Sequence, residues 1–201
     1  MIIPLAVLFV AVAVVLGWYF VTTNVETPDY EVAIRDGKIE VRDYPSLRMA
    51  RIATEGQRWD GVRAGFRPLA GYIFAKERAG DKIAMTAPVT QEPSNQEGDK
   101  NWVISFIMPK AYALADLPSP ANADVFLEEV PEKTRAAIRF SGVATDVVLQ
   151  DKTRELEHWL AAREITPLSP PVFAYYNDPF TPGFLRRNEV LFEISTVTNR
   201  P

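Results

Sequence analysis

The segment from Lys82 to Lys110 constrains the fold more than any other part of this 201-residue chain. It contains two apolar runs, KIAMTAPVT and WVISFIMPK, separated by the charged break QEPSNQEGDKN. This pattern predicts two antiparallel strands joined by a long tip. Both runs are too apolar for an exposed ribbon, so other parts of the chain must cover them. Pro88 and Pro109 should mark where strand pairing stops or bends.

Composition limits the possible partners. The chain is 47% hydrophobic, which is enough for one core or for one core with an appendage. Its net charge of −4 gives no electrostatic reason to bind phosphate backbones, so we expect no nucleic-acid partner. The absence of cysteine excludes disulfides and thiolate chemistry, and it leaves the compartment open.

The N-terminus is a long apolar segment. No charged side chain occurs in residues 2–21, and twenty helical residues at 1.5 Å each match a hydrocarbon core of roughly 30 Å. We therefore expect residues 1–22 to form a transmembrane anchor in the lipid bilayer, 23–30 a tether and 31–201 one soluble domain. A cleaved signal peptide is the main alternative, although no Lys or Arg precedes the apolar run. A buried core helix is a further alternative, but the run has no polar face.

The predicted orientation of this single-pass anchor depends on the flanking charges. Arg35 and Lys38 follow the apolar segment, but four acidic residues dilute them. Because acid-rich flanks cross a membrane readily, we expect the soluble domain outside the cytoplasm.

The first half of the domain reads as a hairpin, a strand and a helix. Asp36-Gly37 is a tight-turn signal between Val32 and Val41, and a strand follows at 48–53. Thr54 with Gln57 forms a capping-box pattern that predicts a helix to about residue 77, kinked or broken at Pro68. Its larger apolar residues share one face that we expect to be buried: Trp59, Val62, Phe66, Leu69, Ala70 and Ile73.

The second half repeats this order. Thr145 should cap a second helix to about Arg163, with Leu149, Leu156 and Leu160 on its apolar face. We expect strands at 125–129, 135–140, 172–176 and 189–197, and loops at 111–123 and 177–185.

A shift of 86 positions superimposes the halves, pairing Pro45 with Pro131, Ala50 with Ala136, Ile52 with Ile138 and Gly56 with Gly142. Two β-α-β-β units of this kind can join into one curved sheet. The predicted fold is therefore α+β, a distorted open β-barrel with two flanking helices. The identities are few, so chance agreement is the alternative.

Three separated motifs, KIAMTAPV, SFIMPKAY and YNDPFTPGFLRRNEV, resemble the SOUL haem-binding protein family. The resemblance covers roughly residues 30–195. It implies a distorted barrel of two β-α-β-β halves, binding of haem or another tetrapyrrole in an apolar groove beside the first helix, and no shared set of catalytic residues.

The resemblance also implies which residues bind. Val62, Phe66 and Leu69 would contact the ring, and Arg63, with Arg67 or Lys76 as alternatives, would reach a propionate. Tyr176 would stack on the ligand or hydrogen-bond to it. Each has a plainer interpretation, because apolar residues at helical spacing also form ordinary cores and arginine stems also cover core edges. We expect Arg186 and Arg187 to pair with local carboxylates or carbonyls.

Haem iron is often held by histidine, but the only histidine here is His158, which we expect on the polar face of the second helix. Iron would then be held by Tyr, by Met85 or Met108, or by no strong ligand, so binding would be loose and exchangeable. We find no catalytic triad, metal-ligand cluster or phosphate loop in the sequence. We therefore expect a binding protein rather than an enzyme, with a sensor or interaction module of the same fold as the alternative.

Overall fold

The computed structural model describes residues 25–76, 78–94 and 102–196. Nine strands in this part form one antiparallel sheet in the order β1-β2-β7-β9-β8-β4-β5-β3-β6. The elements are β1 (Glu31–Asp36), β2 (Ile39–Tyr44), β3 (Leu47–Thr54), α2 (Arg58–Ile73), β4 (Val89–Pro93), β5 (Trp102–Ile107), η1 (Leu114–Asp116), β6 (Phe126–Val130), β7 (Lys133–Phe140), α3 (Asp146–Ala161), β8 (Val172–Tyr175), η2 (Gly183–Leu185) and β9 (Asn188–Ile194).

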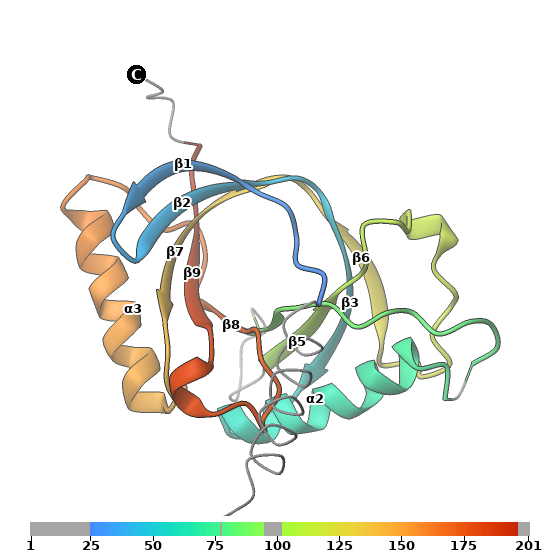
Figure 1. Ribbon diagram of the computed structural model, residues 1–201. Helices are drawn as coiled ribbons and strands as arrows, with labels where there is room; N and C mark the ends of the chain where they lie inside the picture. The colour runs from blue at the N-terminus through green and yellow to red at the C-terminus, as the bar shows by residue number, and fades with distance from the viewer. Residues whose placement is uncertain (1–24, 77, 95–101, 197–201) are drawn as a thin grey trace, which may run out of the picture.

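The sheet curves strongly, and α2 and α3 lie outside the curve (Figure 1). Its edge strands β1 and β6 are not paired with each other, so the barrel is open and the predicted α+β class is confirmed. No helix in the described ranges is long and apolar enough to cross a bilayer. The predicted spanning segment, residues 2–21, lies outside those ranges.

The two predicted repeats are present. The first is β3-α2-β4-β5 and the second is β7-α3-β8-β9. Leu47 and Lys133, which begin β3 and β7, are 86 positions apart, as are Trp102 and Asn188, which begin β5 and β9. The six strands of the repeats are arranged symmetrically about the β8-β4 pair. Each repeat also pairs with the strand that precedes the other repeat in the chain, since β2 pairs with β7 and β6 with β3, and β1 adds an edge strand beside β2. The sequence did not indicate this exchange of strands between the repeats.

The hairpins differ from expectation in their details. In the central hairpin, β4 pairs with β5, but the strand lies later in the chain than predicted. It runs from Val89 to Pro93, so most of the first apolar run precedes it and the predicted break at 91–101 begins inside it. Residues 95–101 of that break lie outside the described residues. In the first hairpin, Asp36 pairs with Ile39. The turn is therefore Gly37-Lys38, one position later than predicted, with Gly37 at φ +58°.

The predicted capping box is wrong. Thr54 is the last residue of β3, and its hydroxyl donates to the Trp102 carbonyl at 3.4 Å. The helix begins at Arg58, and its N-cap Gln57 makes no side-chain capping bond. Pro68 does not break the helix, which ends at Ile73.

The predicted buried face of α2 is confirmed only toward the end of the helix. Leu69, Ala70 and Ile73 are buried as predicted, but Trp59 and Phe66 are 37% and 42% exposed, and Gly61 and Gly65 are buried against the sheet. A Cβ atom at Gly65 would lie 2.6 Å from Ile104 Cγ1. Because glycine lets the helix backbone approach β5 this closely, the first half of α2 packs through its glycines, and the second half packs through large apolar side chains.

The second helix matches its prediction. The Thr145 side chain accepts a hydrogen bond from the Val148 amide, and Leu149, Leu156 and Leu160 are buried. They pack against β7, β8 and β9 in one of the two apolar clusters beneath the helices. His158 is exposed, as expected.

The inner face of the sheet, turned away from both helices, carries a buried ionic network. Both nitrogens of the Arg42 fork donate to Glu189, at 2.7 and 3.1 Å, and these side chains are 2% and 0% exposed. Arg187 and the Tyr176 hydroxyl also donate to this carboxylate, at 2.8 and 2.9 Å. Burial by itself would raise the pKa of Glu189, but the hydrogen bonds and charges of Arg42 and Arg187 outweigh it and lower that pKa.

Gly65→Ala should destabilise the protein by about 1–3 kcal/mol, because the added methyl would overlap Ile104. Gly71→Ala is the matched control in the same helix. A Cβ there meets nothing within 4 Å, so we expect no loss and a gain of up to about 1 kcal/mol from helix propensity. Urea unfolding of both variants measures the difference, and equal effects would contradict the close approach.

Glu189→Gln should cost about 3–5 kcal/mol at neutral pH, because it leaves two cations without their buried counter-charge. The folded-state pKa lies below the ordinary 4.5, so the carboxylate's contribution is complete above that pH and is lost as pH falls through the lower value. Urea unfolding from pH 3 to 8 should therefore show a constant difference from the natural protein above pH 5 that narrows in acid. Glu155→Gln, in an exposed pair with Lys152, should change stability by less than about 0.5 kcal/mol.

Candidate functional site

The predicted ring-contacting residues on α2 are only partly accessible. One flank of the helix carries Trp59, Val62 and Phe66, here called the aromatic stripe. Val62 is half-buried between the two exposed rings. The Trp59 ring centre lies 5.5 Å from that of Tyr175, and the Phe66 ring packs edge-on against Phe106 at 5.2 Å. These contacts fix both rings while leaving one side of each open.

Three of the predicted basic residues lie at the surface. Arg63, Arg67 and Lys76 are exposed, and their side chains make no hydrogen bond or ion pair with any residue in the described part of the chain. Arg63 and Arg67 are on α2, each directly after a residue of the stripe, whereas Lys76 lies beyond the end of the helix. Leu69 is fully buried between α2 and the sheet.

Tyr176 lies on the other side of the sheet. Its hydroxyl donates to Glu189 and the Arg187 guanidinium lies 3.8 Å from its ring centre. Because successive side chains of a strand point to opposite faces, the preceding Tyr175 is the one beside the stripe. The sequence reasoning missed Tyr175. Strand alternation places it on the same face as Phe173, but the structure is needed to show that this face lies beneath the helices.

The loop between β8 and β9, residues 177–187, adds exposed apolar side chains. Phe180, Phe184 and Leu185 are 85%, 78% and 45% exposed. The predicted local pairing of its arginines is confirmed, since Arg186 donates to the carbonyls of Thr181 and Pro179 and Arg187 to Glu189.

This loop lies beside the N-terminal end of α2 (Figure 1). The Gly183 carbonyl accepts a hydrogen bond from the Gly142 amide, and Arg58 donates to the carbonyl of Ala144 two residues further along. The loop and the stripe therefore belong to one region of the surface, which we call the apolar rim.

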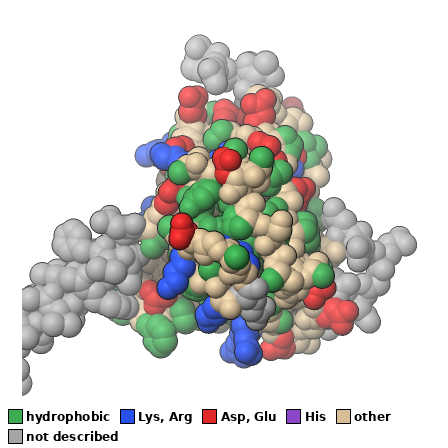
Figure 2. Space-filling model, turned by 90° about the vertical axis from the view of Figure 1, so that its right-hand side faces the viewer, with side chains coloured by type: hydrophobic (Ala, Val, Ile, Leu, Met, Phe, Trp, Pro, Cys, Tyr) green, Lys and Arg blue, Asp and Glu red, His purple; other side chains and the backbone are tan. Residues whose placement is uncertain are grey.

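By contrast, the face that carries β3, β6 and the C-terminal part of α2 shows small groups of hydrophobic side chains between charged ones (Figure 2).

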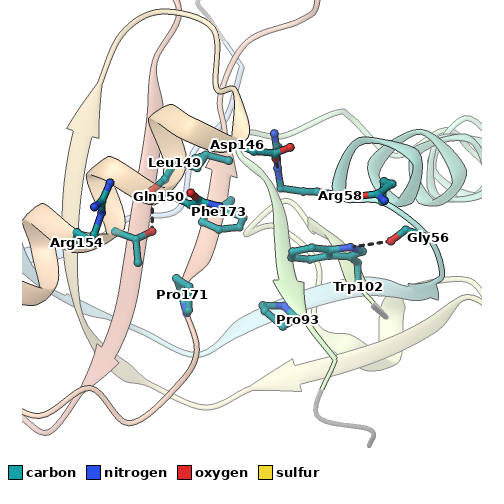
Figure 3. Close-up of a pocket in the computed structure, with 12 residues that line it drawn as sticks. Gly56, Arg58, Pro93, Trp102, Asp146, Leu149, Gln150, Arg154, Pro171 and Phe173 are labelled. Carbon is teal, nitrogen blue, oxygen red and sulfur yellow. Dashed lines mark hydrogen bonds and ion pairs between the residues drawn. The ribbon is translucent and has the colours of Figure 1, made fainter. Parts of the chain in front are cut away.

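A cavity of about 790 Å³ forms a groove between the two helices on the outer face of the sheet (Figure 3). Trp102, Phe173, Leu149, Pro93 and Pro171 form its apolar lining, and Arg58, Asp146, Gln150 and Arg154 are among its polar residues. None of the residues predicted to bind a ligand lines this groove.

Arg58 separates the groove from the apolar rim. Its guanidinium donates to Asp146, to the Tyr175 hydroxyl at 2.9 Å and to Ala144, and it lies 4.6 Å from the centre of the Trp59 ring. Gln91 accepts from Tyr175 and donates to the Arg58 carbonyl at 2.7 Å. Burial raises the pKa of Tyr175 to about 12 against the opposing effect of Arg58, so the hydroxyl stays protonated as a donor.

Candidate iron ligands are few. Met85 is half-buried, whereas Met108 is 3% exposed and belongs to the core. Within the described ranges no group of three His, Asp or Glu side chains is arranged to hold a metal ion.

Comparisons with known proteins identify the family of the chain. The model of the family described as SOUL heme-binding protein matches residues 25–193. Heme-binding protein 2 of Mus musculus is 31% identical over 150 residues, which cover 72% of each chain. Heme-binding protein 2 of Homo sapiens is 33% identical over 129 residues, 60% of this chain and 62% of that protein.

Two solved structures share the fold. The EcmrR C-terminal domain superimposes with a TM-score of 0.59 at 12% identity, covering 84% of this chain and 99% of that one. A hydrolase from Listeria innocua gives 0.56 at 12% identity, covering 81% and 94%. Identities this low concern the fold alone. On the strength of the family match over residues 25–193, the chain belongs to the SOUL haem-binding protein family.

Proposed function

We propose that this protein binds haem or another tetrapyrrole reversibly on the apolar rim, and that it sequesters or transfers the pigment without changing it chemically. The supporting observation is the set of exposed aromatic side chains, Trp59, Phe66, Phe180 and Phe184, in one region with Arg63 and Arg67, which pair with no residue in the described part of the chain. Exposed apolar side chains gathered in one region are typical of interaction sites. A porphyrin has a flat apolar body with two carboxylates, so it can cover the rings and place its propionates on the arginines.

The candidate iron ligands favour weak ligation of the iron. His158 is exposed on α3, and the half-buried Met85 is the more accessible of the two methionines that follow α2. A thioether is a weaker haem ligand than imidazole when it acts alone, so apolar contact supplies most of the affinity. Exchangeable binding of this kind suits a carrier.

Titration of hemin, followed by Soret absorbance, tests the proposal. Phe66→Asp should lower the affinity about 10- to 100-fold. The change removes the ring face that the pigment would cover, and it adds a negative charge that repels the propionates. Arg63→Glu should lower it about threefold to tenfold, through the loss of one solvent-screened charge contact. The matched control is Val147→Asp, an exposed apolar residue on α3 that should leave the affinity unchanged.

A second variant decides where the pigment binds. Thr153→Trp fills the groove between the helices and touches no residue of the rim. Undiminished hemin affinity in this variant agrees with binding on the rim. If Thr153→Trp abolished the Soret shift while Phe66→Asp kept it, the pigment would occupy the groove and the rim assignment would be wrong.

We further propose that residues 2–21 anchor the protein in a membrane with the domain outside the cytoplasm. Glu26, at the start of the described chain, bridges to Thr86, three residues before Val89, which pairs with Tyr175 at the end of β8. The anchor would thus join the domain at the sheet end that carries the β8-β9 loop, and the rim would lie near the bilayer, where apolar pigments partition.

Alkaline carbonate extraction of membranes tests the anchor. The full chain should stay in the pellet, and deletion of residues 2–21 should release it, because the apolar segment supplies the insertion energy. Protease added outside intact cells should digest the domain. Release of the full chain by carbonate would contradict the anchor, and protection from external protease would contradict the orientation.

A sensor or interaction module is the second candidate. The exposed position of His158 favours it, because histidine is a common ligand of haem iron and this one lies at the surface of α3. Failure of the natural protein to give a saturable Soret shift would select it over pigment binding.

A further inference from the structure

A small polar cavity of about 60 Å³ lies on the inner face of the sheet, separate from both the apolar rim and the groove. Its polar lining includes Arg51, Thr90, Ser105 and Arg135, and its apolar lining is Met49, Val130 and Val172. We call it the inner cavity. Lys133, Glu92, Glu193 and Ser169 complete its boundary.

Several polar groups facing this cavity lack a partner in the described part of the chain. Ser105 and Thr90 are 1% and 7% exposed, and neither hydroxyl makes a hydrogen bond there. The Arg51 Nε atom is buried and also unpaired. Strand register places the three side by side, since Ser105 is opposite Thr90 on β4 and Arg51 on β3. Buried polar groups of this kind are normally satisfied by protein or by water, so we expect water or another occupant of the cavity to pair with them.

The charges around the cavity are unevenly matched. Arg51 pairs with Glu92 and Glu128, and Lys133 pairs with Glu193 at 2.5 Å. Arg135 is half-buried and makes no hydrogen bond or ion pair with a described residue; its guanidinium lies 5.7 Å from the Tyr44 ring centre. Burial, with a smaller effect of Arg51, lowers the pKa of Arg135, while Tyr44 and Glu193 oppose the change. One positive charge therefore faces the cavity without a directly bonded carboxylate.

We propose that the inner cavity binds a small planar monovalent anion, a carboxylate of formate size or nitrate. The Arg135 fork supplies two parallel donors for such an anion, and the hydroxyls of Ser105 and Thr90 donate to its remaining oxygen positions. A cavity of about 60 Å³ has space for a few waters or for one anion of this size. The anion would neutralise Arg135 and stabilise the inner face.

Thermal unfolding of the full-length protein in sodium formate tests the site, with sodium benzenesulfonate at equal ionic strength as the reference salt that is too large to enter. The midpoint should rise saturably in formate, by about 3–5 °C at ten times the dissociation constant. Arg135→Met should abolish this rise. Its midpoint without formate should be at least that of the natural protein, because the variant removes an unpaired, half-buried charge.

Arg139→Met is the matched control, an exposed arginine on the same strand, and it should keep the formate response. Line broadening of ¹³C-formate gives a second readout that does not depend on stability. Broadening that saturates with the natural protein and disappears with Arg135→Met supports the site. An equal formate response in Arg135→Met, or no saturable response in the natural protein, would mean that the cavity holds only water and would overturn the proposal.

Discussion

The pairing of β4 with β8 joins the two repeats, and the arrangement of the surface depends on it. Only three residue pairs form this ladder, from Val89 opposite Tyr175 to Gln91 opposite Phe173. So short a ladder is reinforced by side chains, because Arg58 links the start of α2 to Asp146 on α3, Tyr175 on β8 and Gln91 on β4. The cluster fixes the start of each helix against the centre of the sheet.

The groove and the apolar rim both follow from this central cluster. Arg58 lines the groove on one side and lies against Trp59 of the aromatic stripe on the other. The groove and the apolar rim are therefore adjacent surfaces on either side of Arg58, and no residue of the aromatic stripe lines the groove. Arg58 lies between the two surfaces, and its hydrogen bonds to the Tyr175 hydroxyl and the Ala144 carbonyl hold the guanidinium in place.

The two faces of the sheet have different chemistry. The outer face carries the apolar clusters beneath α2 and α3, which supply most of the buried apolar area. The inner face carries two smaller apolar clusters together with the network around Glu189 and the inner cavity. Most polar groups of the network are paired within it, as the hydrogen bonds of Arg42, Arg187 and Tyr176 to Glu189 show.

Local sequence signals predicted much of this architecture. The Thr145 cap, the apolar face of α3 and the repeat of β-α-β-β units came from short-range patterns and are confirmed. The start of α2 and the first half of its buried face were predicted wrongly, because Thr54 is held in β3 by the Trp102 carbonyl and because Gly61 and Gly65 form the contact surface there, whereas Leu69, Ala70 and Ile73 are buried as predicted. Patterns of large apolar residues do not reveal a helix that packs through its glycines.

The candidate site was predictable in part for the same reason. Helical spacing and family resemblance identified Val62, Phe66 and Arg63, which the structure brings together on one flank of α2. The exposed rings of Phe180 and Phe184, the groove at the Arg58 cluster and the inner cavity each depend on side chains from distant strands or loops meeting in space. No local pattern encodes such meetings.

The sequence by itself determined the order of the elements, the twofold repeat and the side-chain types available for binding, because these follow from periodicity and composition along the chain. Only the tertiary structure decided which strands are exchanged between the halves, that Tyr175 and not Tyr176 faces α2, and where polar groups are left without partners. The reason is geometric: strand register and helix rotation are set by contacts between residues far apart in the chain, and a shift of one position sends a side chain to the opposite face.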